Sequence, residues 1–179
     1  MKTIKLWAGI LMLLPVFSPP LFSATILTGE SVTVTDPIEG NVYASAGQVR
    51  ISATINGDLT AGAGELRLLD TVRRDMVVGG GRVRIEGVVG DDLRCGGGEV
   101  WLMGRVHGDV IVGAGQLEIG RGAVVHGDLV VGGGEVRVYG RVLGSVIVAG
   151  GRVQFEGEAD KQVKIRGGEI LLDGIVRGP

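Results

Sequence analysis

The chain has 179 residues, a formal net charge of −2, one cysteine and 34 glycines. Its glycine share far exceeds the usual roughly 7%, yet it falls short of the one-third that a collagen repeat requires. The 45% hydrophobic content excludes a disordered chain, the lone Cys95 excludes a disulfide scaffold, and the balanced charge gives no reason to expect nucleic acid.

Residues 1–24 have the pattern of a secretory signal peptide. Lys2 and Lys5 form a positive segment, Leu6 to Phe17 form an apolar one, and small residues follow near a cleavage point. We therefore expect an exported protein, periplasmic or extracellular. The alternative is an uncleaved membrane anchor through residues 6–22, because this stretch approaches the roughly 20 residues that span a bilayer.

A 17-residue repeat fills the chain from Glu39 to Val176. It gives eight units, of which seven have 17 residues and the fifth has 19, with two extra residues around Gly120-Arg121-Gly122. Numbered from Glu39 as position 1, the units are apolar at positions 4, 6, 11, 13 and 17, and position 9 is always glycine. Apolar spacing of two is typical of strands with one buried face, and no unit has helical spacing.

One unit is too short to bury its own apolar face, so successive units must stack, with equal positions about 4.8 Å apart. We predict an all-β fold, a single-stranded three-sided parallel β-helix (β-solenoid) of eight coils over residues 39–176. Residues 25–38 keep the register and should form half a coil that acts as the N-terminal cap; residues 177–179 form a short tail. Glycine at position 9 is expected at a corner that needs a positive φ or a close backbone approach.

The pattern Gly-Asp-φ-x-φ (φ here an apolar residue), then glycine and a second φ-x-φ strand, occurs in HGDLVVGGGEVRVYGRV, and it resembles the bactofilins. The closest local match is Ile119 to Val131, and the resemblance covers residues 39–176. It implies a right-handed β-helix that polymerises end to end without nucleotide and scaffolds membrane-associated processes. Bactofilins are typically cytoplasmic with disordered tails, whereas this chain has an export-type N-terminus and almost no C-terminal tail. The resemblance to bactofilins therefore supports the fold and self-assembly of this chain more strongly than it supports a cytoskeletal role.

Position 3 holds a column of aspartates: Asp58, Asp75, Asp92, Asp109 and Asp128. They could bind hard cations, which prefer oxygen ligands, but we favour hydrogen bonds to the local turn backbone. His107 and His126 open successive units and, with Asp109 and Asp128, are candidate metal ligands. A solvated corner without a dedicated loop argues against such a site, so we expect no metal and no cofactor.

Catalytic motifs are not evident in the sequence. The glycine triplets recur with the coil and open no helix, so they are not nucleotide-binding loops. The six-residue period and projecting loops of the hexapeptide acyltransferases are absent as well. Cys95 falls on an inward position and is expected to be a small core residue. We expect a protein that is not an enzyme.

Two apolar surfaces are candidate contact sites. Position 5 should point outward, yet it is largely apolar, which indicates either a lateral contact stripe or ordinary strand propensity. The stripe comprises Tyr43, Val77, Ile111, Val130 and Ile147. The terminal coils should expose unpaired strand edges and an open core, which we expect to form the self-assembly interface. Its residues are Ile170, Leu172, Ile175 and Val176 at one end, with Val32 and Val34 at the other.

Positions 10 and 12 also point outward and mix acidic with basic residues. We expect Arg82 to pair with Glu65 and Glu99, and Arg67, Arg84 and Arg137 to pair with Glu118 and Glu135. Such a face is solvated and adds little stability for each pair.

The sequence favours a non-enzymatic, self-assembling structural protein of the bacterial cell envelope, similar to a bactofilin scaffold. Its expected partner is a second copy of itself in an end-to-end homopolymer or homo-oligomer, with membrane or cell-wall association. The alternative is an extracytoplasmic binding module or adhesin that uses the stripe or the charged face.

Overall fold

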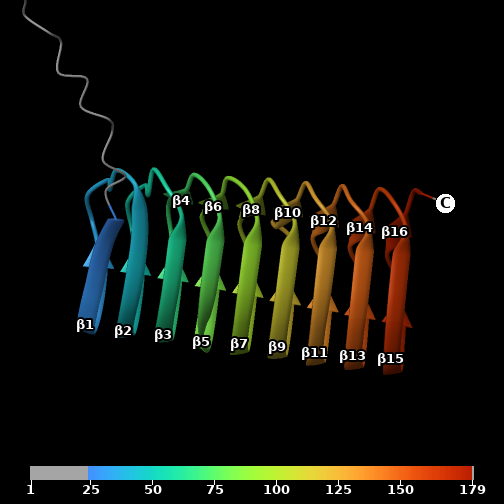
Figure 1. Ribbon diagram of the computed structural model, residues 1–179. Coiled ribbons are helices and arrows are strands. Elements are labelled where there is room, and N and C mark those ends of the chain that lie inside the picture. The colour runs from blue at the N-terminus through green and yellow to red at the C-terminus, as the bar shows by residue number, and fades with distance from the viewer. Residues whose placement is uncertain (1–23, 179) are drawn as a thin grey trace, which may run out of the picture.

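The structure is a computed structural model that describes residues 24–178. These residues form sixteen β-strands in two parallel sheets (Figure 1). The predicted β-solenoid is therefore confirmed. Residues 1–23, which hold nearly all of the expected signal peptide or anchor, and Pro179 of the tail lie outside the described residues. Within residues 24–178, no helix is long and apolar enough to cross a membrane.

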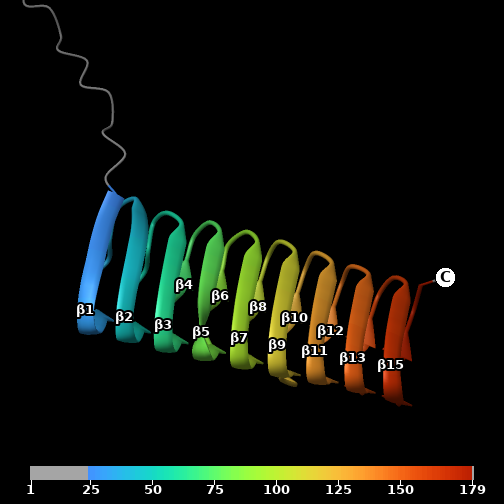
Figure 2. The ribbon, with the colours of Figure 1, turned by 60° about the horizontal axis from the view of Figure 1, so that its bottom comes forward.

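Nine long strands form the larger sheet, and they stand side by side in chain order from one end of the molecule to the other (Figures 1 and 2). They are β1 (Ala24–Val34), β2 (Asn41–Ile51), β3 (Leu59–Leu68), β5 (Met76–Ile85), β7 (Leu93–Leu102), β9 (Val110–Ile119), β11 (Leu129–Val138), β13 (Val146–Phe155) and β15 (Val163–Leu172). Each pairs in parallel with the strand of the next turn, with equal repeat positions opposite one another.

Seven short strands form the smaller sheet, again one for each turn. They are β4 (Thr71–Val72), β6 (Val88–Val89), β8 (Arg105–Val106), β10 (Val124–Val125), β12 (Arg141–Val142), β14 (Glu158–Ala159) and β16 (Ile175–Val176). Each pairs with the strand one turn away, as β6 does with β4. The two ends of the described chain therefore lie at opposite ends of the stack (Figure 1).

The molecule has nine turns, where the repeat predicts eight and a half-coil. The segment expected to be half a coil contains a full-length strand, β1, which pairs with β2 from Ala24 to Val34. Thr25 occupies position 4, where later coils have apolar residues, so the sequence pattern did not reveal this strand. In the smaller sheet the first turn contributes only an isolated bridge from Ile38 to Ile55.

The core is built from the predicted positions. In β5, for example, Met76, Val78, Val83 and Ile85 are buried, and they lie at positions 4, 6, 11 and 13. The inward–outward alternation changes phase in the middle of each long strand, because positions 9 and 10 both lie outside the core. A strand that bends there supplies two sides of the coil and the short strand supplies the third.

Glycine at position 9 is explained by close backbone approach and not by backbone conformation. Among residues 24–178, the only positive φ belongs to Gly40, at 93°. A Cβ added at Gly64, Gly81 or Gly115 would lie 2.8–2.9 Å from the carbonyl oxygen of the position-9 glycine one coil earlier. Any side chain would therefore push successive coils apart at the bend.

The two extra residues of the fifth unit form an outward turn between β9 and β10. The Ala123 N–H donates to the Gly120 carbonyl oxygen at 2.9 Å and closes this turn. Pairing on both sides resumes at the expected positions, with Ile119 opposite Val138 and Val124 opposite Arg105. The insertion thus leaves the stack intact, as its place in the repeat predicts.

Candidate interaction surfaces

The position-3 aspartates form a hydrogen-bond ladder along the solenoid. The Oδ1 atom of each accepts the backbone N–H of the position-3 residue in the following coil, at distances from 2.7 to 3.3 Å. Asn41 begins the ladder by accepting from the Asp58 N–H at 3.0 Å. The partner is therefore the next coil, and the expectation of a bond within the local turn is wrong in this respect. At this corner of the coil, the side-chain oxygens accept the backbone N–H groups that a backbone carbonyl of the neighbouring strand would accept in a regular sheet.

The same ladder bears on the cation hypothesis for this column. Within residues 24–178, one group of three carboxylates, Asp75, Asp91 and Asp92, brings its ligand atoms within 4.8 Å of one another. Two of its members already accept ladder hydrogen bonds, and the second oxygen of Asp92 lies 3.0 Å from Arg94. The hydrogen bonds account for Asp75 and Asp92 without an ion.

The two histidines are neighbours, as their places in the repeat predict. The ring centroids of His107 and His126 lie 4.9 Å apart in an edge-to-face arrangement. His126 Nδ1 lies 3.2 Å from the Val106 carbonyl oxygen, so one ring nitrogen has a backbone partner. Asp109 and Asp128 use their Oδ1 atoms in the ladder. The expectation that these four residues hold no metal stays a prediction.

Cys95 lies in the core of β7, as its position predicts. Burial raises the pKa of its thiol to about 12, because the thiolate would lose its hydration among aliphatic side chains. Such a thiol stays protonated at neutral pH and is chemically inert.

The charged face at positions 10 and 12 follows the prediction at Arg137, which pairs with Glu135, and departs from it at Arg67, Arg82 and Arg84. The register places Arg82 between Glu65 and Glu99, yet the ion pairs join Arg67 and Arg84 to Glu86, at 2.8 and 3.7 Å. Arg137 pairs with Glu135 on its own strand at 2.6 Å, and Arg84 also lies 5.1 Å above the Trp101 ring. Glu86 lies at position 14, which the expected pattern did not include.

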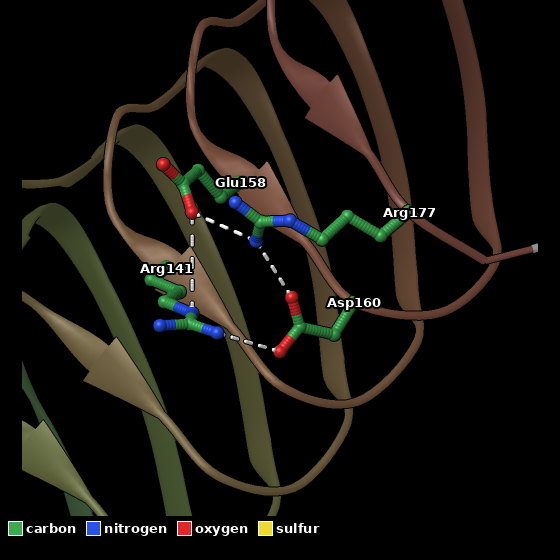
Figure 3. A network of polar contacts seen from close by, with 4 residues as sticks. All are labelled: Arg141, Glu158, Asp160 and Arg177. Carbon is green, nitrogen blue, oxygen red and sulfur yellow. Dashed lines mark hydrogen bonds and ion pairs between the residues drawn. The ribbon is translucent and has the colours of Figure 1, made fainter.

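Sequence reasoning missed an ion-pair network that ties the last coil to the two before it. Arg177 donates from Nη1 to Glu158 and to Asp160, both at 2.9 Å, and Arg141 donates from Nη2 to the other oxygen of Asp160 at 2.9 Å (Figure 3). These hydrogen bonds, that of Arg177 first, lower the pKa of the Asp160 carboxyl, and the pKa of Arg177 is raised in turn. The 17-residue spacing of Arg177 and Asp160 could have revealed the contact.

The position-5 residues form one continuous line across the larger sheet. The strand register places Ile26 next to Tyr43 and so on through every turn to Lys164. All five predicted members of the stripe are exposed, at 38–47% of their surface, and Ile26 extends it at 74%. The sequence pattern did not place Ile26 there because the first strand was not recognised.

The two ends of the solenoid differ. At the C-terminal end Ile170, Leu172, Ile175 and Val176 are exposed. The residues at the positions of Ile170, Leu172 and Val176 one turn earlier are buried, whereas Glu158, opposite Ile175, is half-buried. At the other end Val32 and Val34 are buried at 9% and 5% exposure, so the expectation that they form an open surface is wrong. Two other residues of the first turn, Leu27 and Ile38, pack against the same core. The open apolar surface is therefore at the C-terminal end.

No protein-family model, no curated protein and no solved structure matches this chain. The solenoid fold and its surfaces are thus the basis for functional inference, and the likeness to bactofilins stays an interpretation of the repeat.

Proposed function

We propose that this protein is a non-enzymatic structural protein of the bacterial cell envelope that assembles end to end, as a bactofilin-like scaffold. The observation that carries the proposal is the open C-terminal coil. Its residues Ile170, Leu172 and Val176 are 41–56% exposed, although they continue columns that are buried in the preceding turns. Exposed apolar area of this kind favours association with a matching surface.

The edge of the last coil supports the same proposal. Within residues 24–178, β15 and β16 are paired only on the side of the preceding turn. An unpaired strand edge offers backbone N–H and C=O groups to any strand that can continue the sheet. A terminal coil of a second copy brings both sheets and the same column spacing, which a strand from an unrelated globular protein does not.

The envelope location rests on the sequence of residues 1–24, and the bactofilin-like role rests on the repeat. A β-solenoid presents columns of equivalent residues and flat sheet faces, which suit a scaffold. The aspartate ladder and the buried thiol are accounted for by structure alone. These points support a structural role over a catalytic one.

The test is to express the full chain in an exporting bacterial host and to examine the purified product. N-terminal sequencing reports whether residues 1–24 are removed, and negative-stain microscopy with light scattering reports assembly. We expect rods or filaments longer than one molecule, whose length grows with protein concentration. A monodisperse monomer at high concentration would overturn the proposal.

A matched pair of variants in one strand locates the contact. Leu172→Glu puts a charge into the open core column, whereas Leu171→Glu puts the same charge on the neighbouring outward position, and both side chains are more than half exposed. Leu172→Glu should abolish assembly and Leu171→Glu should preserve it, with unchanged circular dichroism in both. Equal assembly by the two variants would show that the C-terminal coil is not the contact.

A further inference from the structure

The face of the larger sheet formed by positions 4 to 8 carries an apolar ridge. Its exposed residues are Ile26, Tyr43, Val77, Ile111, Val130 and Ile147, all at position 5. They stand in a line because each pairs with the position-5 residue of the next turn. The line is interrupted only by Thr60 and Arg94, and an exposed apolar line of this length is a candidate contact surface.

Beside the ridge runs a groove of residues at position 7. Five successive turns have glycine there: Gly62, Gly79, Gly96, Gly113 and Gly132. A Cβ at Gly62 or Gly113 would meet no atom within 4 Å, and at the other three it would meet only a carbonyl oxygen at 3.8–4.0 Å. None of the five has a positive φ, so neither packing nor backbone conformation within the coil requires glycine.

This is the reverse of position 9, where the neighbouring coil leaves no room for a Cβ. Glycine inside a strand lowers stability, and it commonly marks a place where another chain approaches the backbone closely. Since no contact inside the chain requires the position-7 glycines, they leave room for a surface outside the chain to approach the backbone. At the N-terminal end of the face, a shallow hollow lies between Tyr43, Thr60 and Gly62, where the ridge and the groove adjoin.

We propose that two copies of this protein associate side by side through this face, with their axes parallel and their coils in register. A two-fold axis parallel to the solenoid, above position 6, sets position 5 of each coil against position 7 of the same coil in the partner. Each coil then supplies its own projection and recess: Val77 with Gly79, Ile111 with Gly113, and Val130 with Gly132. Ridge and groove interlock at these three turns.

A second copy fits this face better than a partner of another fold. The ridge repeats at the spacing of adjacent strands, about 4.8 Å, and a second copy presents its glycine recesses at the same spacing and in the same turns. Eight turns by five residues give a face of roughly 38 Å by 16 Å, so a pair would bury roughly 1,200 Å² in total. Specific interfaces begin at about 1,200 Å², so the area suffices for a reversible dimer.

Three basic side chains on this face, those of Arg94, Lys164 and Arg166, affect the strength of the contact. Arg94 interrupts the ridge in the middle turn, but Asp92 holds its guanidinium at 3.0 Å and offsets its charge. In the last turn Lys164 and Arg166 occupy positions 5 and 7, so they would face Arg166 and Lys164 of the partner subunit. Like charges repel at this distance and salt screens them, so the pair should tighten as ionic strength rises.

The test measures self-association by sedimentation velocity over a concentration series, with every variant in the Leu172→Glu background. This background removes the end-to-end contact, so failure of the lateral contact and failure of the proposed function are distinguishable. The double variant Ile111→Lys/Val130→Lys should weaken association about tenfold or more. The control Gln48→Lys/Gln116→Lys adds the same charge to exposed positions on the adjoining side of the coil, and it should not.

Two further variants distinguish association by interlocking of ridge and groove from association driven by exposed apolar area alone. Gly113→Val fills a recess and adds apolar surface, so it should weaken association although it makes the face more hydrophobic. Lys164→Val/Arg166→Gly removes the repulsion in the last turn, and it should tighten association at low salt and abolish the salt dependence. Equal association of the ridge variant and the control, or tighter association of Gly113→Val, would overturn the proposal.

The register has a direct readout. A mixture of protein carrying Ile111→Cys with protein carrying Gly113→Cys should be linked by a short bis-maleimide between the two chains. A mixture of Ile111→Cys with Thr60→Cys, three coils away, should not be linked. Linkage in the second mixture alone would exclude a parallel, in-register pair.

Discussion

Glycine has two different roles in this chain at the level of single residues. At position 9 a Cβ would collide with the carbonyl oxygen of the preceding coil, as at Gly115, whereas two residues earlier Gly113 has open space around it. The two lie in the same strand, β9, and both are exposed. The sequence shows only a run of small residues there, and the distinction comes from the distance to the neighbouring turn.

This difference predicts opposite effects of the same substitution. Gly115→Ala should destabilise the fold by about 1–3 kcal/mol, because the Cβ forces neighbouring coils apart. Gly113→Ala should raise the stability by about 0.4–1 kcal/mol, since alanine restricts the unfolded chain and meets nothing in the folded one. Urea unfolding of dilute protein measures both, and equal effects would contradict the assignment.

The aspartate ladder predicts that the acceptor oxygen matters and the charge does not. Asp109→Ala removes the acceptor of the Asp128 N–H and should cost about 1 kcal/mol. Asp109→Asn keeps an oxygen at the same place, as Asn41 does at the start of the ladder, and should retain the wild-type stability. If urea unfolding shows equal losses for both variants, the charge is needed and a bound cation regains support.

The buried thiol provides a third residue-scale prediction. Because burial raises the pKa of Cys95 to about 12, native protein should not react with a thiol reagent at pH 8. The same reagent should label the thiol fully once urea has unfolded the chain. Rapid labelling of native protein would place Cys95 outside the core.

At the scale of elements, the last short strand, β16, is followed by an arginine whose ion pairs join it to the preceding turn. β16 has two residues, and Arg177 just beyond it joins Glu158 of β14 and Asp160 of the same turn (Figure 3). The pKa of Asp160 is lowered by these hydrogen bonds. A carboxyl whose folded-state pKa is depressed stabilises the fold above its unfolded pKa, and this contribution is lost as pH falls through the folded value.

The Asp160→Asn variant tests this linkage. It should lower the urea midpoint at pH 6, where the carboxylate is charged, and the difference from wild type should vanish once the pH falls below the lowered pKa of Asp160. The contribution is small, because the carboxylate is solvent-exposed and its ion pairs are screened. A difference that persists unchanged in strong acid would show that the ion pairs do not stabilise the last coil.

At the scale of the whole molecule, the solenoid is a one-dimensional stack in which each turn contacts its two neighbours. The C-terminal turn has a neighbour on one side within the described residues, and all of β15 is exposed or half-buried. Local unfolding should therefore begin there, since stability in a repeat protein is largely the sum of contacts between adjacent turns.

Amide hydrogen exchange should show this gradient. In dilute protein, the amides of β15 and β16 should exchange faster than those of β7 and β9 in the middle of the stack. At concentrations where the protein assembles, protection of β15 should rise, because the proposed end-to-end contact covers it. Uniform exchange along the chain would contradict both the one-dimensional description and the open C-terminal coil.

The sequence by itself determined the fold, because a 17-residue period of inward aliphatic residues can be buried only by stacking. It also placed Cys95 in the core and located the outward stripe, since alternation along a strand assigns each side chain to a face. It did not reveal the first strand, where Thr25 interrupts the apolar column, or the burial of Val32 and Val34.

Tertiary structure alone decided what the repeated glycines and aspartates do. The aspartates reach the backbone of the next coil, Glu86 takes the ion pairs expected elsewhere, and glycine is required at position 9 but has free space at position 7. These outcomes depend on contacts between turns that are 17 residues or more apart in the chain. The excess of glycine that excludes other classes of protein at the outset is thus partly a requirement of the coil. The position-7 glycines, by contrast, shape the outer surface of the coil.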